Sequence, residues 1–290
     1  MNDSQAVESR FYKGPESSCY DVAGNRLVVV CFCWKGKAHL EDGANCQDRA
    51  NVYACFAEGT VSNRLVAVVA DGVSTQPLSG KGATLACDAI GEEFCERNST
   101  ISPPLERFKK AQARFIEMCR ADKGQEPPTA SEDESGQAPP PLDSVVEYAT
   151  TVLVLCTDGA NYWAAGVGDG AIYSISSGGH TAKRLTEIHR EGYVNEVRPL
   201  TNPKWDIGYF ESHTDFVAER EIEGFCLMTD GLSESIGNPN AYFAAVWPEL
   251  RTRLGKPAEL AEYAEAFCRY WEDHKFSDDD KTLLAIFVNP

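Results

Sequence analysis

The chain has 290 residues, of which 43% are hydrophobic and 10% aromatic, so it carries enough apolar surface for a large core and is not disordered as a whole. Its 44 acidic and 27 basic residues give a formal charge of −17, which argues against binding nucleic acid or an anionic membrane surface. No apolar run reaches the length of a membrane span, and the polar start of the chain does not read as an export signal. We therefore expect a cytoplasmic protein.

Eight apolar segments, rich in β-branched and aromatic residues, predict strands. They cover residues 26–34, 51–57, 64–71, 149–158, 161–169, 170–176, 224–230 and 282–288. Short turns, such as Asp158 to Asn161, join several of them and favour antiparallel hairpins over parallel crossovers.

Four segments have apolar residues at helical spacing, and the last begins at Pro257, a residue favoured in a first helical turn. They cover residues 80–97, 105–120, 240–254 and 257–271. Strands interrupted by pairs of helices predict an α+β domain in which helices cover sheets.

Residues 122–147 hold five of the fifteen prolines and eight charged residues, and such a composition cannot bury enough apolar surface to offset the entropy of ordering. We predict a disordered insertion there, within a single domain over 26–290 that follows a polar segment at 1–25. The eleven cysteines form no Cys-x-x-Cys pair, and most lie in apolar runs, which predicts buried free thiols.

Aspartates recur where predicted strands begin or end. They are Asp48, Asp71, Asp169, Asp230 and the run Asp278 to Asp280. Taken singly, each is typical of a turn, but five such sites beside unusually apolar strands indicate a carboxylate cluster. Because clustered carboxylates repel one another, a hard divalent cation such as Mg²⁺ or Mn²⁺ would stabilise them, and a pair of such ions hydrolyses phosphate esters.

The order and spacing of these motifs resemble those of the type 2C metal-dependent protein serine/threonine phosphatase family. The matching segments are Asn45 to Asp48, Val69 to Val73, Ala149 to Thr151, Gly168 to Ala171, Met228 to Leu232 and Asp279 to Thr282. The pair formed by Gly36-x-x-His39 and Asp279-Asp280 is similar to a bacterial branch of that family.

The resemblance implies a four-layer sandwich of two antiparallel sheets flanked by helices, with a flap-like region near 178–220. It also implies two Mn²⁺ or Mg²⁺ ions and a third, weaker one, with ligands from Asp48, Asp71, Gly72, Asp169, Asp230 and Asp279. The implied activity is hydrolysis of phosphoserine and phosphothreonine in proteins by a water that the two metals activate, with no phosphoenzyme. The protein would act on a phosphorylated protein substrate as a monomer and oppose a serine/threonine kinase.

The chain departs from the family pattern at several positions that would contact phosphate or its leaving group. Gln47 replaces a frequent Glu, Gly43 stands where some members have Arg, and the turn at Asp169 lacks the usual Ser and Arg. Two alternatives therefore stay open. One is a pseudophosphatase that binds a phosphoprotein or a kinase without turnover, and the other is a carbohydrate- or calcium-binding β domain.

No histidine follows Asp71-Gly72, where many members of the family have one. His39 lies in a loop-like stretch that leads to Asp48, and its ordinary pKa suits proton donation to the leaving group near neutral pH. We therefore consider His39 and Asp48 as catalytic residues. The alternative for His39 is a structural imidazole that bonds the loop backbone, and the two hypotheses have equal weight.

Overall fold

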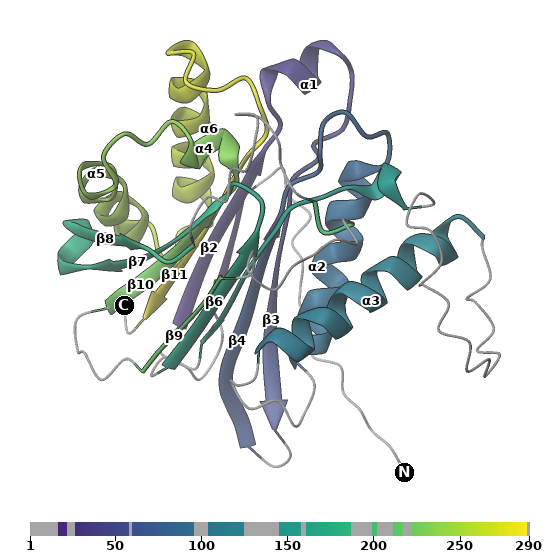
Figure 1. Cartoon of the computed structure of the whole chain (residues 1–290). Coiled ribbons are helices and arrows are strands. Elements are labelled where there is room, and N and C mark those ends of the chain that lie inside the picture. Colours follow the sequence, from purple (N-terminus) through teal and green to yellow (C-terminus); the bar gives the residue numbers. More distant parts are fainter. Residues whose placement is uncertain are drawn as a thin grey trace.

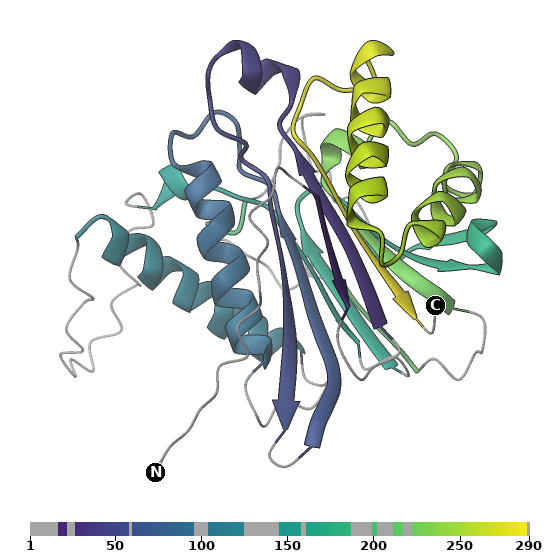
Figure 2. The same cartoon turned by 180° about the vertical axis from the view of Figure 1, so that it is seen from behind.

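The computed structural model describes residues 17–21, 27–57, 60–95, 104–124, 145–157, 161–186, 199–201, 211–216 and 222–288. Two sheets pack face to face, and helices cover the outer face of each, as Figure 1 and the reverse view in Figure 2 show. The predicted α+β sandwich of two antiparallel sheets flanked by helices is confirmed.

The first sheet has six strands in the spatial order β1-β2-β11-β10-β7-β8, and all its neighbours pair antiparallel. Its strands are β1 (Ser17–Asp21), β2 (Leu27–Trp34), β7 (Ala171–Ser176), β8 (Thr181–Arg184), β10 (Ile222–Met228) and β11 (Lys281–Val288). The second sheet has the order β3-β4-β5-β6-β9 and is also antiparallel. Its strands are β3 (Arg49–Ala57), β4 (Thr60–Ala70), β5 (Val152–Thr157), β6 (Asn161–Val167) and β9 (Glu211–Phe216).

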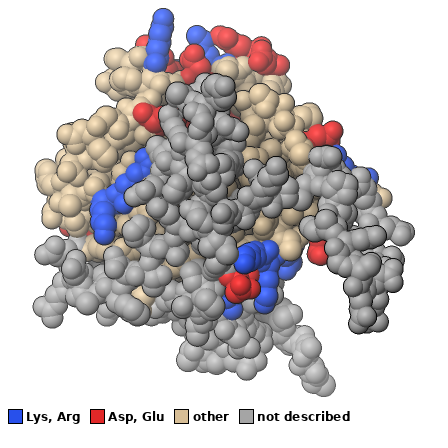
Figure 3. Space-filling view, viewed as in Figure 1, with Lys and Arg blue, Asp and Glu red and all other residues tan. Residues whose placement is uncertain are grey.

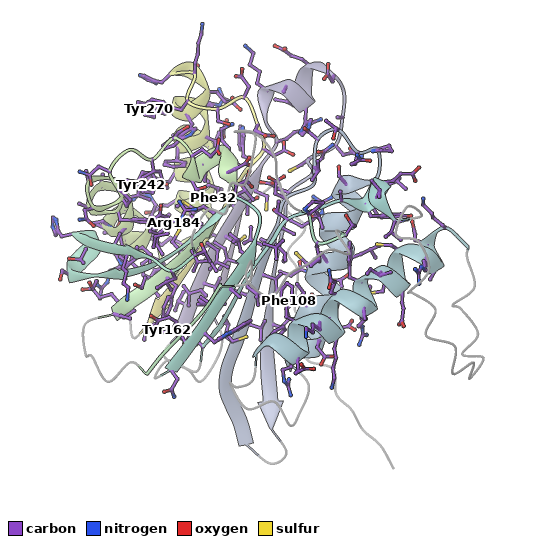
Figure 4. All side chains as sticks on the ribbon, viewed as in Figure 1. Phe32, Phe108, Tyr162, Arg184, Tyr242 and Tyr270 are labelled. Atoms are coloured by element: carbon purple, nitrogen blue, oxygen red, sulfur yellow. The ribbon has the colours of Figure 1, made fainter. Side chains whose placement is uncertain are left out.

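Strand β4 shows why the apolar runs form a sandwich. Successive side chains of a strand point to opposite faces, so Leu65, Ala67 and Val69 pack between the sheets while their neighbours pack under the helices. Both faces are buried, which explains a continuous apolar run rather than an alternating one. Between the sheets, the rings of Tyr162 and Phe225 lie 4.9 Å apart; Tyr162 is labelled in Figure 4.

Two helices cover each sheet. The five-stranded sheet carries α2 (Ser79–Cys95) and α3 (Pro104–Asp122), and Phe108, labelled in Figure 4, is fully buried on α3. The six-stranded sheet carries α5 (Pro239–Thr252) and α6 (Pro257–Asp273). No helix in the described part of the chain is long and apolar enough to cross a membrane.

One edge of the sandwich collects the ends of many strands. In antiparallel sheets, the end of one strand lies beside the start of its neighbour. The registers pair Ala70 at the end of β4 with Arg49 at the start of β3, and Met228 at the end of β10 with Ala171 at the start of β7. The short helix α1 (Lys37–Glu41) lies at this edge, at the top of Figure 1.

All eight predicted strands and four predicted helices are present, with shifted ends, but the sequence missed several short elements. These are β1, α1, α4 (Asp230–Ser233), β8, β9 and the 3-10 turns at Val146–Tyr148 and Ser177–Gly179. Strand β1 lies inside the predicted polar segment 1–25, and β8 and β9 lie inside the region 178–220 that we expected to be flap-like. All three are edge strands, which pair on one side only and therefore show a weak apolar pattern.

Of the predicted insertion at 122–147, residues 125–144 lie outside the described residues. Its ends are part of the fold. Asp122 closes α3, accepts a hydrogen bond of 2.7 Å from the Tyr148 hydroxyl and forms an ion pair with Lys81 of α2. The disorder predicted for these two ends is wrong, because the contacts of Asp122 with Tyr148 and Lys81 attach them to the folded part of the chain.

The prediction of free thiols is confirmed for eight cysteines of the described chain and wrong for another. The free cysteines are Cys31, Cys33, Cys46, Cys87, Cys119, Cys156, Cys226 and Cys268. Cys95, the last residue of α2, is disulfide-bonded. Sequence spacing did not reveal it, because the pairing of cysteines depends on which elements the fold brings together.

Candidate functional site

The five carboxylates predicted to bind metal all lie at the edge marked by α1 in Figure 1. Asp48 immediately precedes β3, Asp71 immediately follows β4, Asp169 lies between β6 and β7, Asp230 opens α4 after β10, and Asp279 lies just before β11. The antiparallel order therefore brings together residues that are up to 231 positions apart in the sequence.

Asp48 is the most deeply buried of these carboxylates, with an exposed fraction of 1%. The hydroxyl of Thr229 donates a hydrogen bond of 2.9 Å to its Oδ2 and accepts one of 3.0 Å from the amide of Thr282. Burial, followed by the nearby charge of Asp280, raises the pKa of Asp48 to about 8. Asp48, which precedes β3 of the five-stranded sheet, is thus fixed to Thr229, which directly follows β10 of the six-stranded sheet.

Asp71 and Asp230 form the centre of the cluster. Burial raises the pKa of Asp71, followed by the charges of Asp48, Asp230 and Asp279. Burial likewise raises the pKa of Asp230 to about 7, with further contributions from Asp169 and Asp279. A side-chain hydrogen bond between these two carboxyl groups raises the pKa of Asp71 and lowers that of Asp230, so the protonation of each group depends on the other.

The backbone around Asp71 is held from two sides. Its carbonyl accepts hydrogen bonds of 2.8 Å from the amide of Thr151 and from the hydroxyl of Thr150, so the predicted Thr-Thr motif supports this turn. Gly72 donates to the carbonyl of Gln47 at 3.3 Å, and a Cβ at Gly72 would overlap the backbone of Ser79. Glycine is therefore required at this position, where the predicted carbonyl ligand lies.

The donor set fits a hard divalent cation. Oδ1 of Asp48 and Oδ1 of Asp230 are buried and have no hydrogen-bond partner among the described residues. Neither these two groups nor Asp71 pairs with a Lys or Arg side chain in that part of the chain. No three His, Cys, Asp or Glu side chains of the described ranges are grouped as ligands of one ion.

The turn at Asp169 is held by an arginine that the sequence did not reveal. Arg184 of β8, labelled in Figure 4, donates hydrogen bonds of 3.4 Å to the carbonyl of Asp169 and 2.9 Å to that of Gly170. Gly168 has a φ of 110°, which favours glycine. The turn itself contains no Arg. Arg184 comes from strand β8, 15 positions after Asp169 and 14 after Gly170.

Asp279 is supported by a buried cation. Lys281 is fully buried, and its Nζ donates a hydrogen bond of 2.7 Å to the Asp279 carbonyl. The same Nζ lies 3.9 Å from Oε1 of Glu272, which accepts a hydrogen bond of 3.0 Å from the indole of Trp34. Sequence analysis missed Lys281, because a lysine at the start of a strand is ordinarily exposed.

His39 is placed on α1 and is 8% exposed. Its Nδ1 lies 2.9 Å from Oδ2 of Asp280, although the two groups are not aligned for a linear hydrogen bond. The observed contact of Nδ1 is with a carboxylate. The structural alternative had supposed a bond to the loop backbone instead. The expected role of His39 in proton donation stays a prediction.

Arg49, the one arginine beside the first acidic motif, is engaged with protein groups. Its guanidinium donates to the carbonyls of Asp48 at 2.8 Å and Cys46 at 3.4 Å, and to the hydroxyl of Thr84 at 3.1 Å. The adjacent Gln47 has a buried Oε1 without a hydrogen-bond partner in the described part of the chain. The segment therefore presents an amide oxygen rather than a cation to the site.

The family model of Protein phosphatase 2C matches residues 35–265. The chain belongs to this family. Several solved structures have the same fold. A serine/threonine phosphatase from S. agalactiae matches with a TM-score of 0.59 at 16% identity, covering 90% of this chain and 99% of that one.

The catalytic domain of the serine/threonine protein phosphatase PstP, in complex with two manganese ions, matches with a TM-score of 0.56 at 17% identity, covering 91% of this chain and 99% of that one. RsbX in complex with magnesium matches with a TM-score of 0.55 at 11% identity, covering 94% and 99%. No curated protein matches the chain by sequence. The predicted family and the prediction of a protein phosphatase are confirmed.

Proposed function

We propose that the protein hydrolyses phosphoserine and phosphothreonine in a protein substrate with the help of Mn²⁺ or Mg²⁺. The observation that carries this proposal is the cluster of Asp48, Asp71 and Asp230. Oδ1 of Asp48 and Oδ1 of Asp230 are buried without a hydrogen-bond partner, and none of the three carboxylates pairs with a Lys or Arg among the described residues. The manganese and magnesium complexes of family relatives support the choice of metal.

Two ions would be held by Asp71, the carbonyl of Gly72, Asp230 and Asp279, and a third, weaker ion by Asp169 with Asp230. When bound, they would neutralise the phosphate and acidify water for attack on phosphorus. In Figure 3, Asp and Glu side chains lie beside Lys and Arg side chains at the upper edge over α1. The carboxylates of the site itself would repel a phosphate without such cations.

The chain itself supplies orientation. Thr229 holds Oδ2 of Asp48, which leaves Oδ1 of this carboxylate to accept a hydrogen bond from water at the site. Gln47 Oε1 offers a second acceptor beside it. Together they would direct a water molecule toward phosphorus, and the deep burial of Asp48 keeps its geometry fixed.

A second function, phosphoprotein binding without turnover, is favoured by two observations. Arg49 is held by three protein acceptors and is not directed to a phosphate, and the turn at Asp169 lacks its own Arg. Such a pseudophosphatase would retain the metal ligands and bind a phosphorylated partner or kinase.

The two functions are separated by assaying p-nitrophenyl phosphate and a phosphothreonine peptide with Mn²⁺, Mg²⁺, Ca²⁺ or chelator. Turnover with Mn²⁺ or Mg²⁺ and none with chelator is expected. Metal binding in calorimetry without turnover of either substrate would establish the pseudophosphatase instead. Binding of neither metal would contradict both functions.

Phosphatase activity implies a phosphoprotein substrate, and we place the protein opposite a serine/threonine kinase, as a cytoplasmic monomer. The eight free cysteines favour a reducing compartment, whereas the disulfide of Cys95 does not. Sedimentation at micromolar concentration is expected to give a mass near 31.8 kDa, and a value near twice this mass would contradict the monomer.

A further inference from the structure

Protein groups contact both carboxylate oxygens of Asp280. The amide of Gly36 donates to Oδ1 at 2.7 Å, the amide of Gln47 donates to Oδ2 at 2.5 Å, and Nδ1 of His39 lies 2.9 Å from Oδ2. The residue is 1% exposed. A buried carboxylate with several N–H partners is strongly fixed, since such bonds are about twice as strong as neutral ones.

These contacts dock α1 on the turn before β11. The amide of Ala38 donates a hydrogen bond of 3.1 Å to the carbonyl of Asp278, which adds a backbone contact to those of Asp280. Gly36 packs so closely that a Cβ there would overlap the backbone of Asp279. The Gly36-x-x-His39 motif is therefore explained by a close approach at its first residue and by a carboxylate contact at its last.

The same carboxylate also fixes the segment that carries Asp48. Asp280 binds the amide of Gln47, and the carbonyl of Gln47 accepts a hydrogen bond of 3.3 Å from the amide of Gly72. Asp48 is thus held at two points, through the backbone of the preceding residue by Asp280 and through its own Oδ2 by Thr229.

We propose that Asp280 and His39 are a pair of positioning residues that set the Gln47-Asp48 segment against Asp71 and Gly72, an inference that rests on the proposed function. The pairing explains the acidic residue at 280. An Asn there would have one acceptor oxygen in place of two, and its NH₂ group would face an N–H donor. Asp280 therefore acts through Asp48 and does not itself contact substrate.

Three variants test the pair. Asp280→Asn removes one acceptor, His39→Ala removes the imidazole, and His39→Asn keeps a side-chain N–H near the position of Nδ1 but cannot serve as an acid. An exposed Asp-His pair at the end of α6 supplies matched controls, Asp273→Asn and His274→Ala.

The first measurement is hydrogen exchange of the metal-free protein, read by mass spectrometry over peptides that cover residues 35–48. Asp280→Asn should raise the exchange rate of this segment about tenfold, because a hydrogen bond to a charged group is lost, and the control variants should not. Unchanged exchange in Asp280→Asn would overturn the proposal. This measurement is independent of activity, so it decides the inference even where no substrate is hydrolysed.

The second measurement compares turnover of p-nitrophenyl phosphate and phosphothreonine peptide. A positioning role predicts that His39→Ala lowers both rates by the same factor and that His39→Asn restores both. A general acid matters mainly for the basic leaving group of phosphothreonine, so a loss confined to the peptide, without rescue by Asn, would overturn positioning in favour of proton donation. If the wild-type protein turns over neither substrate with any metal, the proposed function fails instead.

Discussion

Asp280 and the cluster of Asp48, Asp71 and Asp230 lie at the same edge of the sandwich, and they differ in what surrounds their carboxylates. Asp280 receives two backbone N–H groups and an imidazole nitrogen, whereas Asp48 and Asp230 each keep a buried oxygen with no partner among the described residues. Burial and mutual repulsion raise the pKa values of Asp48, Asp71 and Asp230. A carboxylate supplied with donors can stabilise the fold, whereas carboxylates without them require charge from outside.

The largest effect is expected where charge is removed from the carboxylates that lack hydrogen-bond donors. Asp71→Asn or Asp230→Asn removes a ligand charge at nearly constant volume, and Mn²⁺-dependent turnover of p-nitrophenyl phosphate should fall by about a thousandfold or more. Asp273→Asn, an exposed change of the same kind, is the control. Near-normal turnover in either variant would remove these residues from the metal site.

The second effect concerns the stability of the metal-free protein. The folded-state pKa values of Asp48, about 8, and Asp230, about 7, lie above the unfolded value of about 4. The folded state therefore binds more protons, and the stabilisation from this proton uptake is complete below pH 4 and is lost as pH rises toward 8. In chelator, the melting temperature should be lower at pH 8 than at pH 5.5. Addition of Mn²⁺ should raise the melting temperature more at pH 8 than at pH 5.5.

The control for this pH dependence is Asp230→Asn, which removes one of the titrating groups and should flatten the curve. In chelator at pH 8 it should also raise the melting temperature, since it relieves repulsion. A melting temperature in chelator that rises steadily from pH 5.5 to pH 8 would be incompatible with the raised pKa values.

A smaller effect is expected at the turn that carries Asp169. Arg184→Met removes the donors to the carbonyls of Asp169 and Gly170, so the Mn²⁺ concentration for half-maximal activity should rise about fivefold, with little change in kcat. Lys183→Met, an exposed change on the same strand, should leave this concentration unchanged. Identical metal titrations for both variants would show that Arg184 does not support the site.

The smallest effect is expected for the stretch 125–144. Replacing residues 125–144 by a short Gly/Ser linker keeps the contacts of Asp122 with Tyr148 and Lys81. We predict that the melting temperature and aryl phosphatase activity are retained, and that limited proteolysis of the parent protein cuts within this stretch first. A loss of activity confined to a phosphoprotein substrate would assign the segment to partner recognition, and a lower melting temperature would show that it packs.

The sequence alone predicted the long elements and the order of the acidic motifs. Strand β4 and helix α2 bury enough apolar surface to carry a strong periodic pattern, and such patterns depend on neighbouring residues along the chain. The edge strands β1 and β9 were missed, because their stability comes from hydrogen bonds to a neighbouring strand that the sequence does not show.

At the site, the sequence predicted Asp48, Asp71 and Asp230 as metal ligands, since their positions at the ends of apolar segments can be recognised from the order of residues alone. Tertiary structure alone decided the partners: Asp280 for His39 and Gln47, Lys281 for the Asp279 carbonyl, and Arg184 for the turn at Asp169. The contacts of Asp280 span more than 230 positions. Hydrogen bonds act over about 3 Å in space, so only the pairing of strands determines which distant residues can form them.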